Sequence, residues 1–238
     1  MSPLFEELDY RDTPMGELIL RRRRLLSMDG LMVYEVKLGE AYLMSSLFHA
    51  AETALADTAL GELEGSGWDV VVGGLGLGYT AAAALAFEPL RRLVVVEALE
   101  PVIDWHKAEL VPNSDILNKD ERCRYYHADF FALARGPGFD PDSAGRRFDA
   151  ILLDIDHSPE DRLDETHGDF YTEKGLAQLK THLKPGGVFA LWSNDPPAQD
   201  FLKTLGRVFD RAEGRIIEFD NPLQQNTSAN GIYLARCR

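Results

Sequence analysis

Residues 70–78 read Val-Val-Val-Gly-Gly-Leu-Gly-Leu-Gly, an apolar run followed directly by a glycine-rich loop. A continuous apolar run is typical of a strand that is buried on both faces of a parallel sheet. Glycines in the loop allow the backbone to turn tightly and to approach a ligand closely. These glycines are Gly73, Gly74, Gly76 and Gly78. The stretch therefore predicts the first strand and ligand-binding turn of a doubly wound α/β fold, with a helix over the alanine-rich residues 79–87.

Apolar runs and helical patterns alternate along the rest of the chain. The expected strands cover residues 93–96, 124–127, 150–153, 188–192, 215–219 and 231–235, and the expected helices cover 101–110, 173–183 and 198–209. The last two strands have no helix between them, which predicts an antiparallel pair at one edge of the sheet. Seven strands with this ending predict a Rossmann-like methyltransferase fold, with a mostly parallel sheet and an antiparallel last strand.

The first part of the chain has a different pattern, with strands and no helix between them. Residues 17–24 and 31–38 read as two strands joined by a turn that contains Gly30, which predicts a β hairpin. We expect a small β-rich arm over residues 1–45 and a nucleoside-binding α/β domain over residues 46–238. A two-stranded hairpin is barely stable alone and leaves edges to pair, so we also expect a homodimer in which the arm takes part.

Composition excludes several classes of protein. Acidic residues outnumber basic ones by 39 to 25, a net charge of −14, which argues against a general nucleic-acid binder. The two cysteines, Cys123 and Cys237, lie far apart, which argues against a disulfide scaffold and favours the reducing cytoplasm. No run reaches the roughly 18 apolar residues that span a bilayer.

The spacing of Asp154, Asp156 and two nearby histidines matches no common metal motif, so we expect no metal.

Acidic residues follow the next two strands after the glycine loop. Glu97 lies about 20 residues past the glycines, where a carboxylate can accept hydrogen bonds from both hydroxyls of a ribose. Asp129 can receive the exocyclic amine of adenine, and it can alternatively cap the helix that begins at Phe130. The loop has GxGxG spacing, whereas a dinucleotide-binding loop reads GxGxxG. We therefore expect S-adenosylmethionine or a related sulfonium, with NAD as the weaker alternative.

From about residue 10 to its end, the chain resembles the spermidine synthase family, whose members are aminopropyltransferases built on the methyltransferase fold. Residues 73–78 fall on the family's GGGDGG loop, and Glu97 falls on its ribose-binding acid. Ala128 and Asp129 fall on its adenine-binding pair, and Asp154 falls on its catalytic base. The resemblance implies binding of S-adenosylmethionine or decarboxylated S-adenosylmethionine by these residues, and alkylation of a small amine.

The sequence departs from the family where the acceptor binds. The family's loop aspartate, which holds an amine of the polyamine, is Gly76 here. Residues 154–159 read Asp-Ile-Asp-His-Ser-Pro where the family has Asp-Ser-Ser-Asp-Pro, and Leu43-Met44-Ser45 replaces a Tyr-His-Glu run. Several groups that would bind a diamine are missing together. These departures from the family imply that the protein is not an efficient putrescine aminopropyltransferase.

Attack on a carbon bonded to a positively charged sulfur needs alignment of the reactants and an unprotonated amine. A carboxylate beside the amine can take its proton, and Asp154 is the first candidate for this role. Asp156 faces the same side if the strand continues that far, and two carboxylates so close would raise the pKa of one of them. Two alternatives stay open, a small-molecule S-adenosylmethionine-dependent methyltransferase and a non-catalytic nucleoside-binding homologue.

Overall fold

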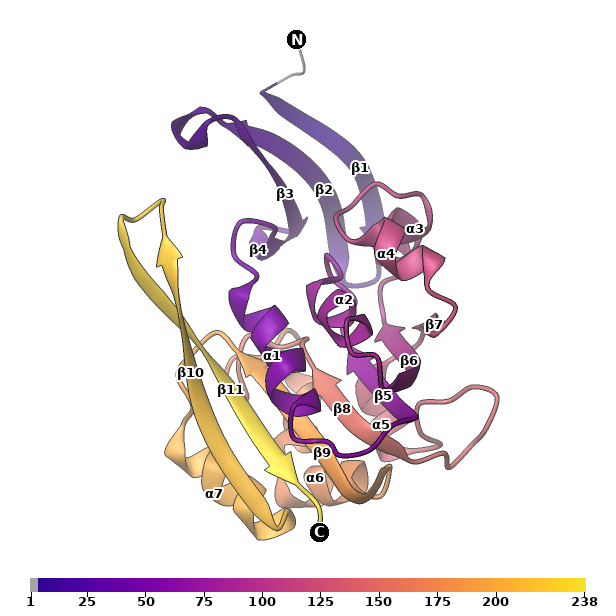
Figure 1. Cartoon of the computed structure of the whole chain (residues 1–238). Coiled ribbons are helices and arrows are strands. Elements are labelled where there is room, and N and C mark those ends of the chain that lie inside the picture. The colour runs from indigo at the N-terminus through magenta and orange to yellow at the C-terminus, as the bar shows by residue number, and fades with distance from the viewer. Residues whose placement is uncertain (1–3) are drawn as a thin grey trace.

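The computed structural model describes residues 4–238 and contains two sheets (Figure 1). The larger sheet has seven strands in the order β10-β11-β9-β8-β5-β6-β7. They are β5 (Trp68–Gly73), β6 (Leu90–Glu97), β7 (Cys123–His127), β8 (Phe148–Leu153), β9 (Leu183–Ser193), β10 (Arg211–Asn221) and β11 (Asn226–Arg236). Strands β5 to β9 pair in parallel, and β11 is antiparallel to both of its neighbours. The predicted α/β fold with its antiparallel ending is confirmed.

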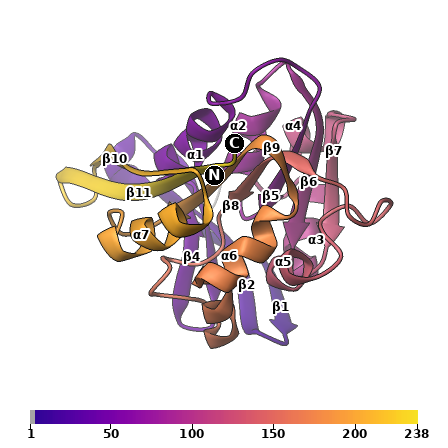
Figure 2. The ribbon, with the colours of Figure 1, turned by 90° about the horizontal axis from the view of Figure 1, so that it is seen from below.

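Helices cover both faces of this sheet, as Figure 2 shows for α1 and α2 on one side and α6 and α7 on the other. The helices are α1 (Ala50–Leu60), α2 (Tyr79–Leu85), α3 (Glu100–Lys107), α4 (Ser114–Lys119), α5 (Phe130–Arg135), α6 (Glu173–Lys180) and α7 (Gln199–Val208). Alternate residues of β5 point to opposite faces: Val70 and Val72 belong to one buried apolar cluster and Val71 to the other. This double burial explains the continuous apolar run at 70–72.

The N-terminal arm is a four-stranded antiparallel sheet, in which the predicted hairpin forms the two middle strands and the two outer strands were not predicted. Its strands are β1 (Phe5–Thr13), β2 (Gly16–Leu25), β3 (Leu31–Leu38) and β4 (Ala41–Ser45), and a single 3₁₀ turn (Leu26–Met28) joins β2 to β3. Strand β1 has no buried residue, so it lacks the alternation of apolar and polar residues by which strands are recognised. It is held instead by main-chain pairing to β2 and by ion pairs such as Glu6 with Arg22, at 2.8 Å.

The arm packs directly on the α/β part of the chain. Leu18, Leu20 and Val36 are buried in the same apolar cluster as the helices α1 and α2. The indole nitrogen of Trp105 in α3 also donates a hydrogen bond to Asp9 in β1, at 2.6 Å. A division of the chain near residue 45, where β4 ends, stays a prediction because the two parts share this core. No helix within residues 4–238 is long and apolar enough to cross a membrane.

We expect the protein to form a homodimer through the arm. The outer strand β1 exposes about half of each of the apolar side chains Phe5 and Tyr10, and an edge strand offers unpaired main-chain groups to a second copy. Light scattering across micromolar to millimolar concentrations measures the mass in solution. A mass of one chain at every concentration would contradict this prediction.

Candidate active site

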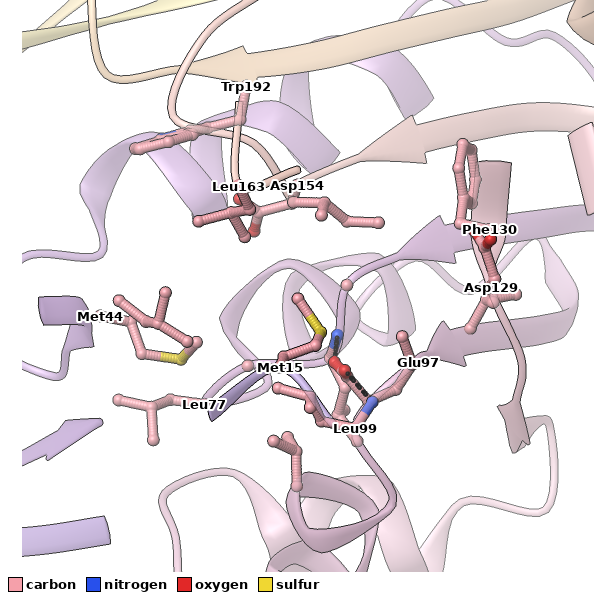
Figure 3. A pocket seen from close by; sticks show the side chains of 18 of the residues that line it. Met15, Met44, Leu77, Glu97, Leu99, Asp129, Phe130, Asp154, Leu163 and Trp192 are labelled. Atoms are coloured by element: carbon pink, nitrogen blue, oxygen red, sulfur yellow. Dashed lines mark hydrogen bonds between the residues drawn. The ribbon is translucent and has the colours of Figure 1, made fainter. Parts of the chain in front are cut away.

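A cavity of about 310 Å³ opens at the carboxyl ends of β5, β6 and β8 (Figure 3), and Leu43 and Met44 of β4 in the N-terminal sheet also line it. Such ends are where doubly wound sheets bind ligands. Most of the residues predicted for the site line this cavity: Gly74, Gly76, Gly78, Glu97, Ala128, Asp129 and Asp154. Two predicted residues, Gly73 and Asp156, do not line it.

The glycine loop brings the main chain against the end of β8. Gly74 has a φ of +93°, and a Cβ atom built on it would lie 2.0 Å from the carbonyl oxygen of Asp154. No side chain fits there, so glycine is required for this close approach. Gly73 serves packing, because a Cβ atom on it would lie 2.4 Å from the ring of Phe130. The main chain of the glycine loop therefore lies directly beside Asp154 in the cavity wall.

Glu97 ends β6 and holds two segments of the cavity wall. One carboxylate oxygen accepts a hydrogen bond from the main-chain N–H of Leu75 at 2.9 Å, and the other accepts from that of Leu99 at 2.8 Å. Burial raises the pKa of Glu97, and the hydrogen bonds from Leu99 and Leu75 oppose that rise. The Glu97 side chain also lines the cavity, where its oxygens can accept hydrogen bonds from further donors. A pair of ribose hydroxyls would supply such donors.

Asp129 caps α5, as the alternative interpretation of the sequence anticipates. Its Oδ1 accepts hydrogen bonds from the main-chain N–H groups of Phe131 at 2.8 Å and Ala132 at 3.2 Å. No hydrogen bond within residues 4–238 involves its other oxygen, and the side chain also lines the cavity. Capping and contact with a ligand are therefore compatible here, and the adenine contact stays a prediction.

Asp154 follows β8 and is fixed from two sides. Its main-chain N–H donates to the carbonyl oxygen of Gly73 at 2.8 Å, and the hydroxyl of Thr80 donates to its Oδ2 at 2.8 Å. Burial raises the pKa of Asp154 to about 6, and the hydrogen bond from Thr80 opposes the rise. A carboxyl group with this pKa is ionised at neutral pH but takes up a proton more readily than an ordinary aspartate.

Asp156 does not stand beside Asp154 in the cavity. Strand β8 ends at Leu153, so the alternation that would place residues 154 and 156 on one side does not continue. The Asp156 side chain is completely buried and accepts hydrogen bonds from the N–H of Leu163 (2.9 Å), from His167 (2.8 Å) and from the hydroxyl of Tyr171 (2.7 Å). This placement argues against the expected general-base role and makes Asp156 the anchor of the segment 163–171.

That segment forms part of the cavity wall through Leu163, Asp164, Thr166 and His167. The ring of His167 stacks on Phe131 with their centroids 3.8 Å apart. Asp156 therefore acts on the cavity indirectly, because it holds the main chain that carries these side chains.

Sequence reasoning missed Glu52 of α1, which also lines the cavity. Burial and the charge of Asp154 raise the pKa of Glu52 to about 8. A signal was present in the sequence: residues 55, 56 and 59, which lie three, four and seven positions further on, are apolar and buried. An acid on the apolar face of a helix is unusual and marks a candidate functional group.

Acidic side chains predominate among the ionisable groups that line the cavity. Among residues 4–238, five carboxylates and no lysine or arginine line it; the acids are Glu52, Glu97, Asp129, Asp154 and Asp164. A cavity with this lining attracts cations and repels anions. Within the same residues, no group of three or more histidine, cysteine or acidic side chains is arranged to hold a metal ion.

One end of the cavity is apolar. Figure 3 shows Met44 and Leu77 on one side of Asp154, with Glu97 and Asp129 on the other. A Cβ atom built on Gly76 would lie 2.9 Å from the sulfur of Met44. The Met44 side chain therefore occupies the space next to residue 76. Leu43, Met15 and Trp192 also line the cavity.

Solved spermidine synthases are similar to this chain along nearly its whole length. A spermidine synthase in complex with the transition state analogue AdoDATO matches with a TM-score of 0.73 at 16% identity, over 97% of this chain and 73% of that chain. Spermidine synthase from Thermotoga maritima matches with a TM-score of 0.71 at 16% identity, over 97% and 72% of the two chains. A probable spermidine synthase from Corynebacterium glutamicum matches with a TM-score of 0.66 at 14% identity, over 99% and 81%.

These similarities show the fold. The chain has the fold of spermidine synthases, an α/β sheet preceded by a small antiparallel sheet, as the resemblance in sequence implies. No family model matches the sequence, and no curated protein matches it either.

Proposed function

We propose that the protein is a transferase that binds an adenosyl sulfonium and uses it to alkylate a small amine. The observation that carries this proposal is the cavity lined by five carboxylates and by no lysine or arginine within residues 4–238. Both the sulfonium and the protonated amine are cations, and such a lining favours both. A neighbour in fold that is complexed with the transition state analogue AdoDATO adds support.

We infer that decarboxylated S-adenosylmethionine is preferred to S-adenosylmethionine. The two differ in a carboxylate, which needs a cationic or N–H partner when it leaves water. The cavity offers no cationic side chain within residues 4–238, and its acids would repel a further carboxylate. A methyltransferase would instead bind S-adenosylmethionine more tightly. Comparing the affinities for the two sulfoniums therefore also tests the methyltransferase alternative.

In the proposed reaction the nitrogen of the acceptor amine attacks the carbon bonded to sulfur. A C–N bond forms, the C–S bond breaks and the sulfur keeps the electron pair as a thioether. Asp154 takes the proton that the acceptor's ammonium group must lose, since a protonated amine has no free electron pair. The remaining cavity residues hold the reactants in line and exclude water.

Replacement of Glu97 by Ala is expected to weaken nucleoside binding by about 1–3 kcal/mol, or roughly 5- to 150-fold in Kd. Two ribose hydroxyls would lose a charged acceptor. Calorimetric titration with decarboxylated S-adenosylmethionine and with S-adenosylmethionine measures the effect and the donor preference together. Glu88→Ala, an exposed acid outside the cavity, is the control.

Affinity unchanged in Glu97→Ala, with circular dichroism showing an intact fold, would overturn the ribose assignment. Failure of the wild-type protein to bind either sulfonium would overturn the proposed function.

A further inference from the structure

Glu52 and Asp154 reach the cavity from two different elements that are tied together. The hydroxyl of Thr80 lies 2.8 Å from Oδ2 of Asp154 and 3.2 Å from the main-chain carbonyl oxygen of Glu52. Thr80 itself is buried, so this link between α1 and the end of β8 is shielded from solvent. Within residues 4–238 the carboxylate of Glu52 accepts no hydrogen bond from the side chain of any other residue. The cavity therefore contains a half-buried acid whose carboxylate has no side-chain partner within residues 4–238.

The remaining acids of the cavity lie elsewhere. Glu97 is bound to main-chain N–H groups of residues 75 and 99, Asp129 caps α5, and Asp164 accepts hydrogen bonds from Thr166. The apolar end, with Met44 and Leu43, supplies no further charge. In a ligand that lies between Asp154 and the apolar end of the cavity, one ammonium group could therefore contact the carboxylates of Glu52 and Asp154. The rest of the ligand would contact apolar side chains.

We propose that Glu52 and Asp154 together form the ammonium site for the acceptor, and that this site selects an amine with a single positive charge and an apolar body. The inference rests on the proposed function and specifies its substrate class. In the reaction the ammonium first loses one proton to the carboxylate pair, and the electron pair that this leaves on its nitrogen forms the C–N bond. The sulfur leaves with the electron pair of the broken C–S bond. The product amine and the thioether then depart, and the proton passes from the pair to solvent.

Calorimetry on protein saturated with methylthioadenosine, a nucleoside thioether, tests the site. The two probes are n-butylamine and putrescine, which have the same four carbons but one and two amines. We expect n-butylamine to bind more tightly than putrescine by about tenfold or more. Glu52→Gln is expected to weaken n-butylamine binding about tenfold or more, since glutamine cannot release a proton to become the charged acceptor that an ammonium group favours. The affinity for methylthioadenosine should stay within about twofold, and Glu88→Gln, the exposed control, should change neither affinity.

The outcomes separate this inference from the proposed function. Unchanged n-butylamine affinity in Glu52→Gln, tighter binding of putrescine, or no amine binding to the nucleoside-loaded protein would each overturn the ammonium site and leave nucleoside binding standing. Failure of methylthioadenosine to bind would contradict the proposed function, and the inference would fall with it.

A ligand-free measurement checks that Glu52 is buried in the cavity near Asp154. The pKa of Glu52 is raised on folding from the ordinary value of 4.5 to about 8, so the folded state holds a proton that the unfolded state has released. Stability contributed by this group is therefore lost as the pH rises through that interval. The groups that face it are Asp154 and the hydroxyl of Tyr79.

Glu52→Gln should therefore melt increasingly above the wild type as the pH rises from about 5 to about 8, whereas Glu88→Gln should not. A melting difference that stays constant with pH would overturn the burial of Glu52 beside Asp154.

Discussion

Replacement of Asp154 by Asn is expected to lower the rate of transfer by about 10³-fold, within the range of roughly 10²- to 10⁴-fold that general bases contribute. Asparagine has nearly the same shape, and its carbonyl oxygen can still accept the hydrogen bond that the Thr80 hydroxyl donates at 2.8 Å. It cannot take up a proton. The loss should therefore appear in the chemical step, and the affinity for the nucleoside should change only a few-fold.

Single-turnover rates with decarboxylated S-adenosylmethionine and n-butylamine measure this effect, and Asp115→Asn on the exposed surface of α4 is the control. The wild-type rate should rise through a pH of about 6, because burial raises the pKa of Asp154 to that value and only the ionised form is a base. This rise should be absent in Asp154→Asn. A variant with wild-type rates would remove Asp154 from the reaction.

The fold could be predicted because its evidence is local. Each central strand of the large sheet is a short apolar run, buried on both faces, and the glycine loop marks the turn after β5. Strand β1 was missed because its pairing depends on residues of β2 and not on its own pattern. Its sequence, Phe-Glu-Glu-Leu-Asp-Tyr-Arg-Asp-Thr, has no apolar face to bury.

The site was only partly predictable because its acceptor end is assembled from distant segments. Asp154 and the glycines follow strand ends, and such positions can be read from the sequence. The proximity of Glu52 to Asp154 depends on how α1 packs against the sheet, and that of Met44 to Gly76 depends on how the N-terminal sheet covers the cavity. Asp156 was misplaced because the exact end of β8, at Leu153, decides which way its side chain points.

Putrescine is expected to be a poor acceptor, with a kcat/KM at least about a hundredfold below that of n-butylamine. Its second ammonium group would have to leave water beside Met44, Leu43 and Trp192, and none of these carries a charge. A charge-assisted hydrogen bond contributes about 1.5–3 kcal/mol, and an efficient diamine site needs more than one of them at its far end. In this cavity a bound diamine would keep one charge unpaired.

The contact between Met44 and Gly76 allows this explanation to be tested by gain of function. Gly76→Asp alone should help putrescine little, because its Cβ atom would lie 2.9 Å from the Met44 sulfur and the methionine side chain would have to shift within the same space. Met44→Ala alone opens space but adds no charge. The double variant supplies both, and we expect it to raise kcat/KM for putrescine about tenfold or more over either single variant. Gly76 has a φ of +48°, which aspartate adopts more readily than most residues, so the strain should be modest. Spermidine formation by the wild-type protein at about 10⁴ M⁻¹s⁻¹ or more, an ordinary enzyme's efficiency, would show that an acid outside this wall already holds the second ammonium group.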